Sequence, residues 1–214
     1  MISPSEIMQS KTMKILKPEK KYTFGDYFNI RNPAEEIIAE LGYHYSTKPL
    51  ALPRDENIEK DSLDGIVTLY YALLPKISLN SEAAKREFMI APLLQAVLKT
   101  SDARLNMEYP VEIDDRLSGM IDYLFRSTQE LIVIEAKKGD LEKGFNQLAA
   151  EMIAMDIYEG DNGMSAIYGA ITIGQVWGFA ILERERKIIT KDAHTFRFPE
   201  DIEDIFSIIR GILK

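Results

Sequence analysis

The chain has 214 residues, 46% hydrophobic and 28% charged, with a formal net charge of −8 and a pI of about 5.0. This length supports one sizeable core. The acidic balance argues against a protein that coats nucleic acid by bulk attraction, although a nucleic-acid enzyme with local basic contacts stays open. The absence of cysteine excludes disulfides and thiolate metal sites. No stretch approaches the ~18 apolar residues of a membrane span, so we expect a cytoplasmic protein without membrane contact.

We expect an N-terminal helical and extended appendage over residues 1–79, packed on a compact domain over residues 80–214. The first segment, Met1–Lys21, carries five lysines and is predicted to be a loosely ordered basic arm, with phosphate contact as the alternative. Within Asn32–Gly42, the N-cap, the first-turn proline, the capping-box acid and the final glycine predict a helix.

After this helix comes an extended stretch, Tyr43–Arg54, and then a helix over Asp61–Leu74 that Pro75 stops. The next predicted helix begins near Asn80–Ser81 and continues to Lys99, and Pro92 should kink or divide it.

One acidic side chain of this third helix falls on its apolar stripe. Glu87 lies four residues after Ala83 and three before Ile90, which is helical spacing. Glu82 lies about 140° away around the axis at ~100° per residue, and we expect it to be more exposed. Glu87 could pair with a neighbouring basic side chain, or it could belong to a functional site.

The second half of the chain alternates between strands and helices. Predicted strands cover Arg104–Ile113, Met120–Phe125, Leu131–Ala136, Ala166–Thr172 and Val176–Glu183, with Arg186–Thr190 as a candidate further strand. Predicted helices cover Leu141–Glu159 and Asp201–Leu213. This order indicates an α/β or α+β protein with a mixed central sheet flanked by helices.

Three charged side chains interrupt or close the apolar strands in the middle of the chain. Asp122 lies within the first strand, and Glu135 and Lys137 close the second. Because side chains alternate faces along a strand, Glu135 and Lys137 point the same way. If the two strands pair, Asp122 can lie beside them. Charges are costly to bury unless they are paired or bind a metal, so the pattern indicates a site.

The acids Glu87, Asp122 and Glu135 together suit Mg²⁺ or Mn²⁺, which prefer oxygen ligands. Such an ion can polarise a phosphoryl oxygen and lower the pKa of a bound water. Lys137 could position that water or stabilise the charge that develops on a phosphate. The alternative is that Glu135 and Lys137 form a surface salt bridge of small energetic value.

Asp122, followed by Glu135-Ala136-Lys137 after an apolar run, resembles the PD-(D/E)XK nuclease superfamily, the restriction-endonuclease-like fold, over roughly Ser81–Trp177. The segment SEAAKREFMIAPLL resembles the superfamily's first helix, GMIDYLF and LIVIEAKK its catalytic hairpin, and GFNQLAAEM the helix after it. The chain looks most similar to uncharacterised, mostly cyanobacterial members related to the nuclease domains of type I restriction R subunits. Ile121 stands where the superfamily's name has proline.

The resemblance implies a restriction-endonuclease-like mixed sheet and a role for each matching residue. Asp122 and Glu135 would be metal ligands, Lys137 the catalytic lysine and Glu87 the acid of the helix, with Glu82 as the less favoured substitute. Gln147, which shares a helix face with Glu151, would be an accessory group.

The function that the resemblance implies is a Mg²⁺-dependent nuclease that hydrolyses DNA phosphodiester bonds with a metal-activated water, alone, as a homodimer or with a partner subunit. The alternative is a catalytically silent subunit that keeps the fold for binding or assembly in a restriction-type or DNA-processing system. The sequence leaves RNA open as a substrate.

Overall fold

The computed structural model describes residues 15–57, 60–127, 130–137 and 139–214. Residues 1–14 of the predicted basic arm lie outside the described part. The described part of that arm is anchored at its start, where Leu16 is buried and the backbone N–H groups of Ile15 and Leu16 donate to the Glu40 carboxylate, while residues 17–21 are exposed. No described helix is long and apolar enough to cross a membrane.

Seven strands form one mixed sheet in the order β1-β7-β6-β5-β4-β3-β2. The pairs β1–β7 and β4–β5 are parallel, and the other neighbours are antiparallel. The strands are β1 (His44–Lys48), β2 (Arg104–Glu112), β3 (Ser118–Arg126), β4 (Leu131–Ala136), β5 (Ala166–Thr172), β6 (Val176–Glu183) and β7 (Ile188–Arg197). The predicted mixed α/β sheet flanked by helices is therefore confirmed.

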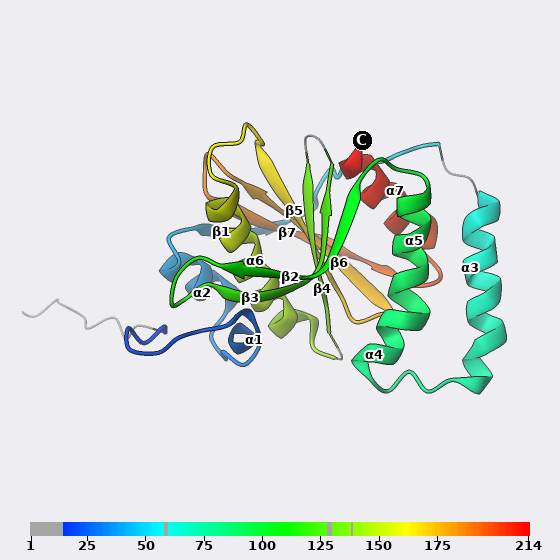
Figure 1. The fold of residues 1–214 in the computed structure, drawn as a ribbon, viewed down its shortest axis with the longest axis horizontal. Coiled ribbons are helices and arrows are strands. Elements are labelled where there is room, and N and C mark those ends of the chain that lie inside the picture. Colours follow the sequence, from blue (N-terminus) through cyan, green and yellow to red (C-terminus); the bar gives the residue numbers. More distant parts are fainter. Residues whose placement is uncertain (1–14, 58–59, 128–129, 138) are drawn as a thin grey trace, which may run out of the picture.

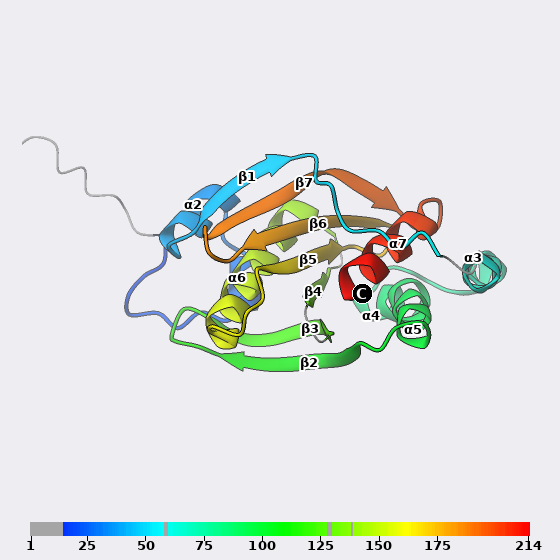
Figure 2. The same ribbon diagram turned by 90° about the horizontal axis from the view of Figure 1, so that it is seen from above.

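Helices gather on both sides of the sheet, as Figures 1 and 2 show. Helices α1, α2 and α6 pack in one core cluster, and α5 and α7 pack in the other, with α3 outermost beyond α5. The helices are α1 (Phe24–Tyr27), α2 (Ala34–Glu40), α3 (Lys60–Leu73), α4 (Glu82–Lys85), α5 (Ala91–Lys99), α6 (Leu141–Glu159) and α7 (Ile202–Leu213). A 3₁₀ turn, η2 (Leu74–Lys76), and a π-helical turn, η3 (Arg86–Ile90), complete the set.

Two elements differ from the sequence prediction. Strand β7 continues to Arg197, well past the predicted end at Thr190, because its polar second half pairs with Val176–Gly178 at one end of β6. The predicted extended stretch after Tyr43 contains strand β1, which pairs with β7, so residues before 80 supply one edge of the sheet.

The helix that Pro92 was expected to divide is divided, into α4, η3 and α5. At the centre of this run the Ala91 N–H donates to the Arg86 carbonyl, five residues back, as in a π-helix. Proline lacks an N–H and crowds the preceding turn, and the wider π turn accommodates it. This extra residue per turn rotates the side chains that precede it relative to those that follow.

Helix α6 is buried along most of its length because the sheet covers one side and α1 and α2 cover the other. The Asp140 side chain caps it by accepting the N–H groups of Glu142 and Lys143, both at 3.1 Å, and Gly160 ends it with a φ of 54°. Every residue from Gly144 to Met155 is buried, including Gln147 and Glu151. Polar side chains on α6 therefore face protein rather than solvent.

Candidate active site

Strands β3 and β4 pair as predicted and bring Asp122 next to Glu135. Tyr123 is paired with Ile134, and continuing that antiparallel register places Asp122 opposite Glu135. The Asp122 carboxylate accepts the backbone N–H of Ala136 at 3.0 Å, which fixes it against the end of β4. Two carboxylates from neighbouring strands thus share one face of the sheet, the face that α6 covers.

Lys137 completes the acid–acid–lysine group. Its ammonium forms an ion pair with Glu135 Oε1, and its backbone N–H donates to the Thr172 carbonyl at 2.7 Å. The Lys137 side chain is 17% exposed and its Nζ lies 5.7 Å from the centre of the Phe28 ring. Glu135 itself is buried, so the pair is not the surface salt bridge of the alternative interpretation.

Helix α6 adds two more polar side chains from the opposite side. Gln147 Nε2 donates to Glu151 Oε1 at 2.8 Å, and Glu151 lies against Glu135. Helix α6 comes this close because Gly144 has no side chain. A Cβ at Gly144 would lie 2.8 Å from Ile171 Cδ1 and 3.2 Å from Lys137 Cγ.

The buried site contains more hydrogen-bond acceptors than donors. Apart from the contact between the Glu135 and Glu151 carboxyls, no donor among the described residues hydrogen-bonds to Gln147 Oε1, Glu151 Oε2 or Glu135 Oε2, and Glu135 Oε1 has its ion pair with Lys137. Ionised carboxylates can only accept hydrogen bonds, so Glu135 and Glu151 cannot bond to each other while both are charged. Buried acceptors without partners are rare and costly, and here they cluster.

The shifts in pKa agree with an excess of negative charge. Burial raises the pKa of the Glu135 carboxyl to about 7, and the nearby charge of Asp122 adds to this while Lys137 opposes it. Burial also raises the pKa of Glu151 well above its ordinary value, with Glu135 adding to the shift. Burial lowers the pKa of Lys137, but the adjacent Glu135 outweighs burial and the net shift is upward. Each of the three shifts favours the form of the group that holds its proton, so the site as a whole favours added positive charge.

The expectation that Glu87 lies on the buried stripe, with Glu82 more exposed, is wrong. Glu87 is exposed, whereas Glu82 is half-buried and its charge contributes to the raised pKa of Lys137. The estimate of ~100° per residue assumed an α-helix, and the π turn η3 breaks that spacing. Within the described residues, no three Asp, Glu or His side chains come together in a way that could hold a metal ion, so Glu87 does not join Asp122 and Glu135.

Two charged residues beside Asp122 were not identified as site residues from the sequence. Arg86 Nη1 lies 3.6 Å from Asp122 Oδ1, and its Nη2 lies 3.9 Å from Glu108 Oε1 on β2. Arg86 comes from η3 and Glu108 from a left-handed position of the backbone, with a φ of 51°. Neither a π turn nor a left-handed glutamate has a sequence signal that would have placed these side chains here.

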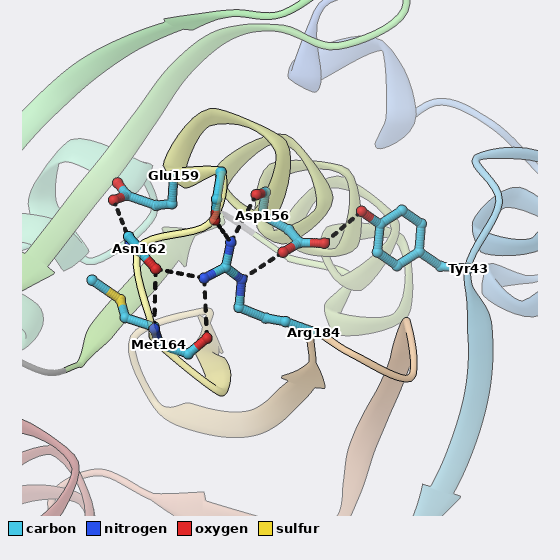
Figure 3. A network of polar contacts seen from close by, with 7 residues as sticks. Tyr43, Asp156, Glu159, Asn162, Met164 and Arg184 are labelled. Carbon is cyan, nitrogen blue, oxygen red and sulfur yellow. Dashed lines mark hydrogen bonds and ion pairs between the residues drawn. The ribbon is translucent and has the colours of Figure 1, made fainter.

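A second polar cluster lies at the C-terminal end of α6 (Figure 3). Arg184 Nε donates to Asp156 Oδ1 at 2.6 Å, its Nη1 to Asn162 Oδ1 and the Met164 carbonyl, and its Nη2 to the carbonyls of Asp156 and Gly160. Tyr43 donates to Asp156 Oδ2 at 2.6 Å. A hollow of about 780 Å³ opens beside this cluster. All five N–H donors of Arg184 are used, so the cluster fastens the end of α6 and leaves no unsatisfied group for a ligand.

The chain matches no protein-family model and no curated protein. The resemblance to the PD-(D/E)XK superfamily therefore stays a prediction based on its motifs.

Proposed function

We propose that the protein is a metal-dependent nuclease that hydrolyses phosphodiester bonds of DNA, and that its sheet belongs to the restriction-endonuclease-like type. The observation that carries the proposal is the surplus of buried acceptors around Glu135, beside Asp122 and a lysine. A protein that used these acids for stability alone would supply them with donors. A cation is the simplest group that would satisfy several carboxylate and amide oxygens at once.

The residues fit a hard divalent ion. Asp122 and Glu135 would hold it, because Mg²⁺ is usually bound by one or two carboxylates and completed by waters and substrate phosphate. Two carboxylate ligands would be enough for such an ion, which agrees with the finding that no three acids or histidines among the described residues are arranged to hold a metal together. When bound, such an ion supplies a water of lowered pKa and polarises the phosphoryl oxygen.

The chain's own groups would then have distinct tasks. The Ala136 N–H orients Asp122, and Gln147 orients Glu151 against Glu135. Lys137 is a cation at the partly open side of the group, where it can orient an attacking water or stabilise charge developing on a phosphate oxygen. Phe28 and α6 exclude bulk water around it, which strengthens each of these charge interactions.

Plasmid nicking in Mg²⁺ or Mn²⁺ tests the proposal. We expect Lys137→Ala and Asp122→Asn each to lower the rate by about 10²-fold or more, the scale of losing one charge-stabilising group. Lys48→Ala, which removes an exposed lysine at the end of β1 on the far edge of the sheet, is the matched control and should nick like the wild type. Equal nicking by all four proteins would contradict the proposal, because the activity would then come from a contaminant.

The second candidate is a catalytically silent subunit that binds or assembles through this fold. The exposed position of Glu87 favours it, because the third acid that the resemblance implies is not in place. Calorimetric titration with Mn²⁺ separates the two candidates. Binding that Asp122→Asn abolishes supports the nuclease, and no binding at millimolar metal supports the silent subunit.

A further inference from the structure

Arg86 lies beside Asp122 of the candidate site, with most of its side-chain donors uncommitted. Its Nε donates to the Tyr123 hydroxyl at 3.2 Å, and its guanidinium carbon lies 5.1 Å from the centre of the Tyr123 ring. The Arg86 side chain is 22% exposed, so its terminal nitrogens can be reached from solvent. Tyr123 therefore fixes the direction of the guanidinium and leaves the two Nη groups facing the acids.

The separations between Arg86 and those acids are too long for hydrogen bonds. Nη1 is 3.6 Å from Asp122 and Nη2 is 3.9 Å from Glu108, whereas N–H···O bonds usually span about 2.7–3.2 Å. Within the described residues, the bond to Tyr123 is the one hydrogen bond that the Arg86 side chain donates. Arg184, by contrast, uses every donor it has. Tyr123 positions the Arg86 guanidinium, and the two Nη groups interact with the acids through charge without a hydrogen bond.

The backbone holds both partners in unusual conformations. Arg86 begins the π turn η3, and Glu108 has a φ of 51°, which costs a residue other than glycine on the order of 1 kcal/mol or more. Met107 pairs with Tyr123 and Tyr109 with Ile121, so Glu108 lies opposite Asp122 on the next strand. Glu108 is 68% exposed, so burial of its side chain does not explain this conformation.

We propose that Arg86 binds a backbone phosphate of the nucleic-acid substrate and that Glu108 restrains it in the free protein. This inference rests on the proposed function, because it takes the substrate to be a nucleic acid. A planar guanidinium with two free Nη groups matches the geometry of a phosphate, which it can bind through two parallel hydrogen bonds. Once the charge of Asp122 is taken up by a cation, Arg86 loses its partner on that side, and its fork becomes available. Glu108 competes with the phosphate for the same guanidinium and so limits the affinity.

The test is the binding of a short fluorescein-labelled DNA duplex to the full chain, by anisotropy across a salt series in Ca²⁺ buffer. We expect Arg86→Ala to weaken binding about tenfold and to reduce the slope of log affinity against log salt by about one, the effect of one lost phosphate contact. Arg86→Lys keeps the positive charge but loses the two parallel donors of the guanidinium. Its affinity for the duplex should lie between those of the wild type and Arg86→Ala. Arg186→Ala is the matched control, since that arginine is 66% exposed and lines the hollow at the far end of α6.

Glu108→Gln provides a test of opposite sign, and it leaves Arg86 intact. We expect this variant to bind the duplex several-fold more tightly, because both the competition for Arg86 and one repulsive charge are removed. The proposal would be overturned if Arg86→Ala and Arg186→Ala had the same slope of log affinity against log salt. Weaker duplex binding by Glu108→Gln would also overturn it, and so would the absence of salt-dependent binding by the wild type. Far-ultraviolet circular dichroism of each variant separates these effects from unfolding, and the Glu108 variant tests the proposal even if Arg86→Ala fails to fold.

The two proposals fail in different ways. Metal-dependent nicking that Lys137→Ala abolishes, together with an unchanged slope for Arg86→Ala, would remove the role of Arg86 and leave the nuclease standing. If Arg86→Ala reduced the slope of log affinity against log salt while the wild type neither nicked plasmid nor bound Mn²⁺, the nuclease proposal would be contradicted. Arg86 would then stand as a nucleic-acid contact.

Discussion

Helix α6 carries two acids, five residues apart, in opposite states. At Asp156, both carboxylate oxygens have donors, one from Arg184 and one from Tyr43, and Arg184 is fully used in turn. At Glu151, one oxygen has Gln147 as its donor, and the carboxyl otherwise faces the Glu135 carboxyl, with no cation or amide donor on its second oxygen among the described residues. Both acids belong to one helix in one core, so general packing does not account for the difference.

The comparison separates a cluster with matched donors and acceptors from the cluster that we propose as the active site. A buried acid with matched donors holds two elements together, whereas a buried acid without them lowers the stability of the fold. Active-site acids are a known case of such unmatched groups. Mutations at the two clusters should therefore change stability in opposite directions.

The largest change in the free energy of unfolding is expected in the Arg184 cluster. Arg184→Ala should lower the free energy of unfolding by about 3–5 kcal/mol, because it leaves Asp156 as a buried charge without its cation. Urea denaturation measures this. Arg186→Ala, two residues along the chain and largely exposed, should change the value by less than about 0.5 kcal/mol. A similar small loss for Arg184→Ala would show that its network does not stabilise the fold.

Asp55 provides a second matched cluster and a pH dependence. Burial acts to raise its pKa, but hydrogen bonds from Lys214, the Asn57 N–H and Arg210 outweigh burial and lower the pKa to about 2. A carboxyl whose pKa is lower in the folded state stabilises the fold above its ordinary pKa of 3.8, and this stabilisation is lost as the pH falls through about 2. Asp55→Asn should therefore cost on the order of 2 kcal/mol at neutral pH.

Unfolding experiments on wild type and Asp55→Asn at a series of pH values check this expectation. The difference between the two proteins should be constant near neutrality and shrink as the pH falls below about 4. A difference that stays constant to the lowest pH would mean that the carboxylate charge of Asp55 contributes nothing.

At Glu151, whose acceptors exceed its donors, we expect a mutation to raise the free energy of unfolding rather than to lower it. Glu151→Gln should raise the free energy of unfolding by about 1–2 kcal/mol without divalent ions, because it removes one of two facing buried carboxyls and leaves a neutral group of the same shape. Thermal denaturation in EDTA measures this, with Glu185→Gln, at an exposed glutamate, as control. A destabilised Glu151→Gln protein would place the Glu151 cluster in the same class as the Arg184 cluster.

The smallest effect is stabilisation by metal. A cation that binds only the folded state should raise the stability of the wild type by about 1–2 kcal/mol at ten times its dissociation constant. A melting series in Mn²⁺ checks this, and Asp122→Asn should show no rise. An equal rise in both proteins would locate the bound metal elsewhere.

The sequence predicted most of the central sheet because the strands have local signals. The apolar runs that became β4, β5 and β6 have the predicted bounds, and α6 runs over the predicted residues between its cap and its final glycine. The pairing of Asp122 with Glu135 followed from the period of two along each strand. Local pattern and local structure agree in these elements.

The rest depended on features without a local signal. Glu87 was placed on the wrong face because a π turn cannot be read from apolar spacing. Arg86 and Glu108 come together from sequence positions more than twenty residues apart, through the β2–β3 register and a left-handed residue that is not glycine. Sequence reasoning therefore found the acids within the strands and missed the cation that faces them.

The left-handed backbone at Glu108 also bears on self-association. Strand β2 is an outer strand of nine residues, and the N–H and C=O groups along the side that does not pair with β3 would offer a template for another chain. Glu108 interrupts the extended geometry near its middle, and Pro110 two residues later has no N–H to donate. At the other edge, β1 is only five residues long and ends in Lys48. Neither border of the sheet is suited to continue into a second copy, so a dimer would have to form through helices or loops.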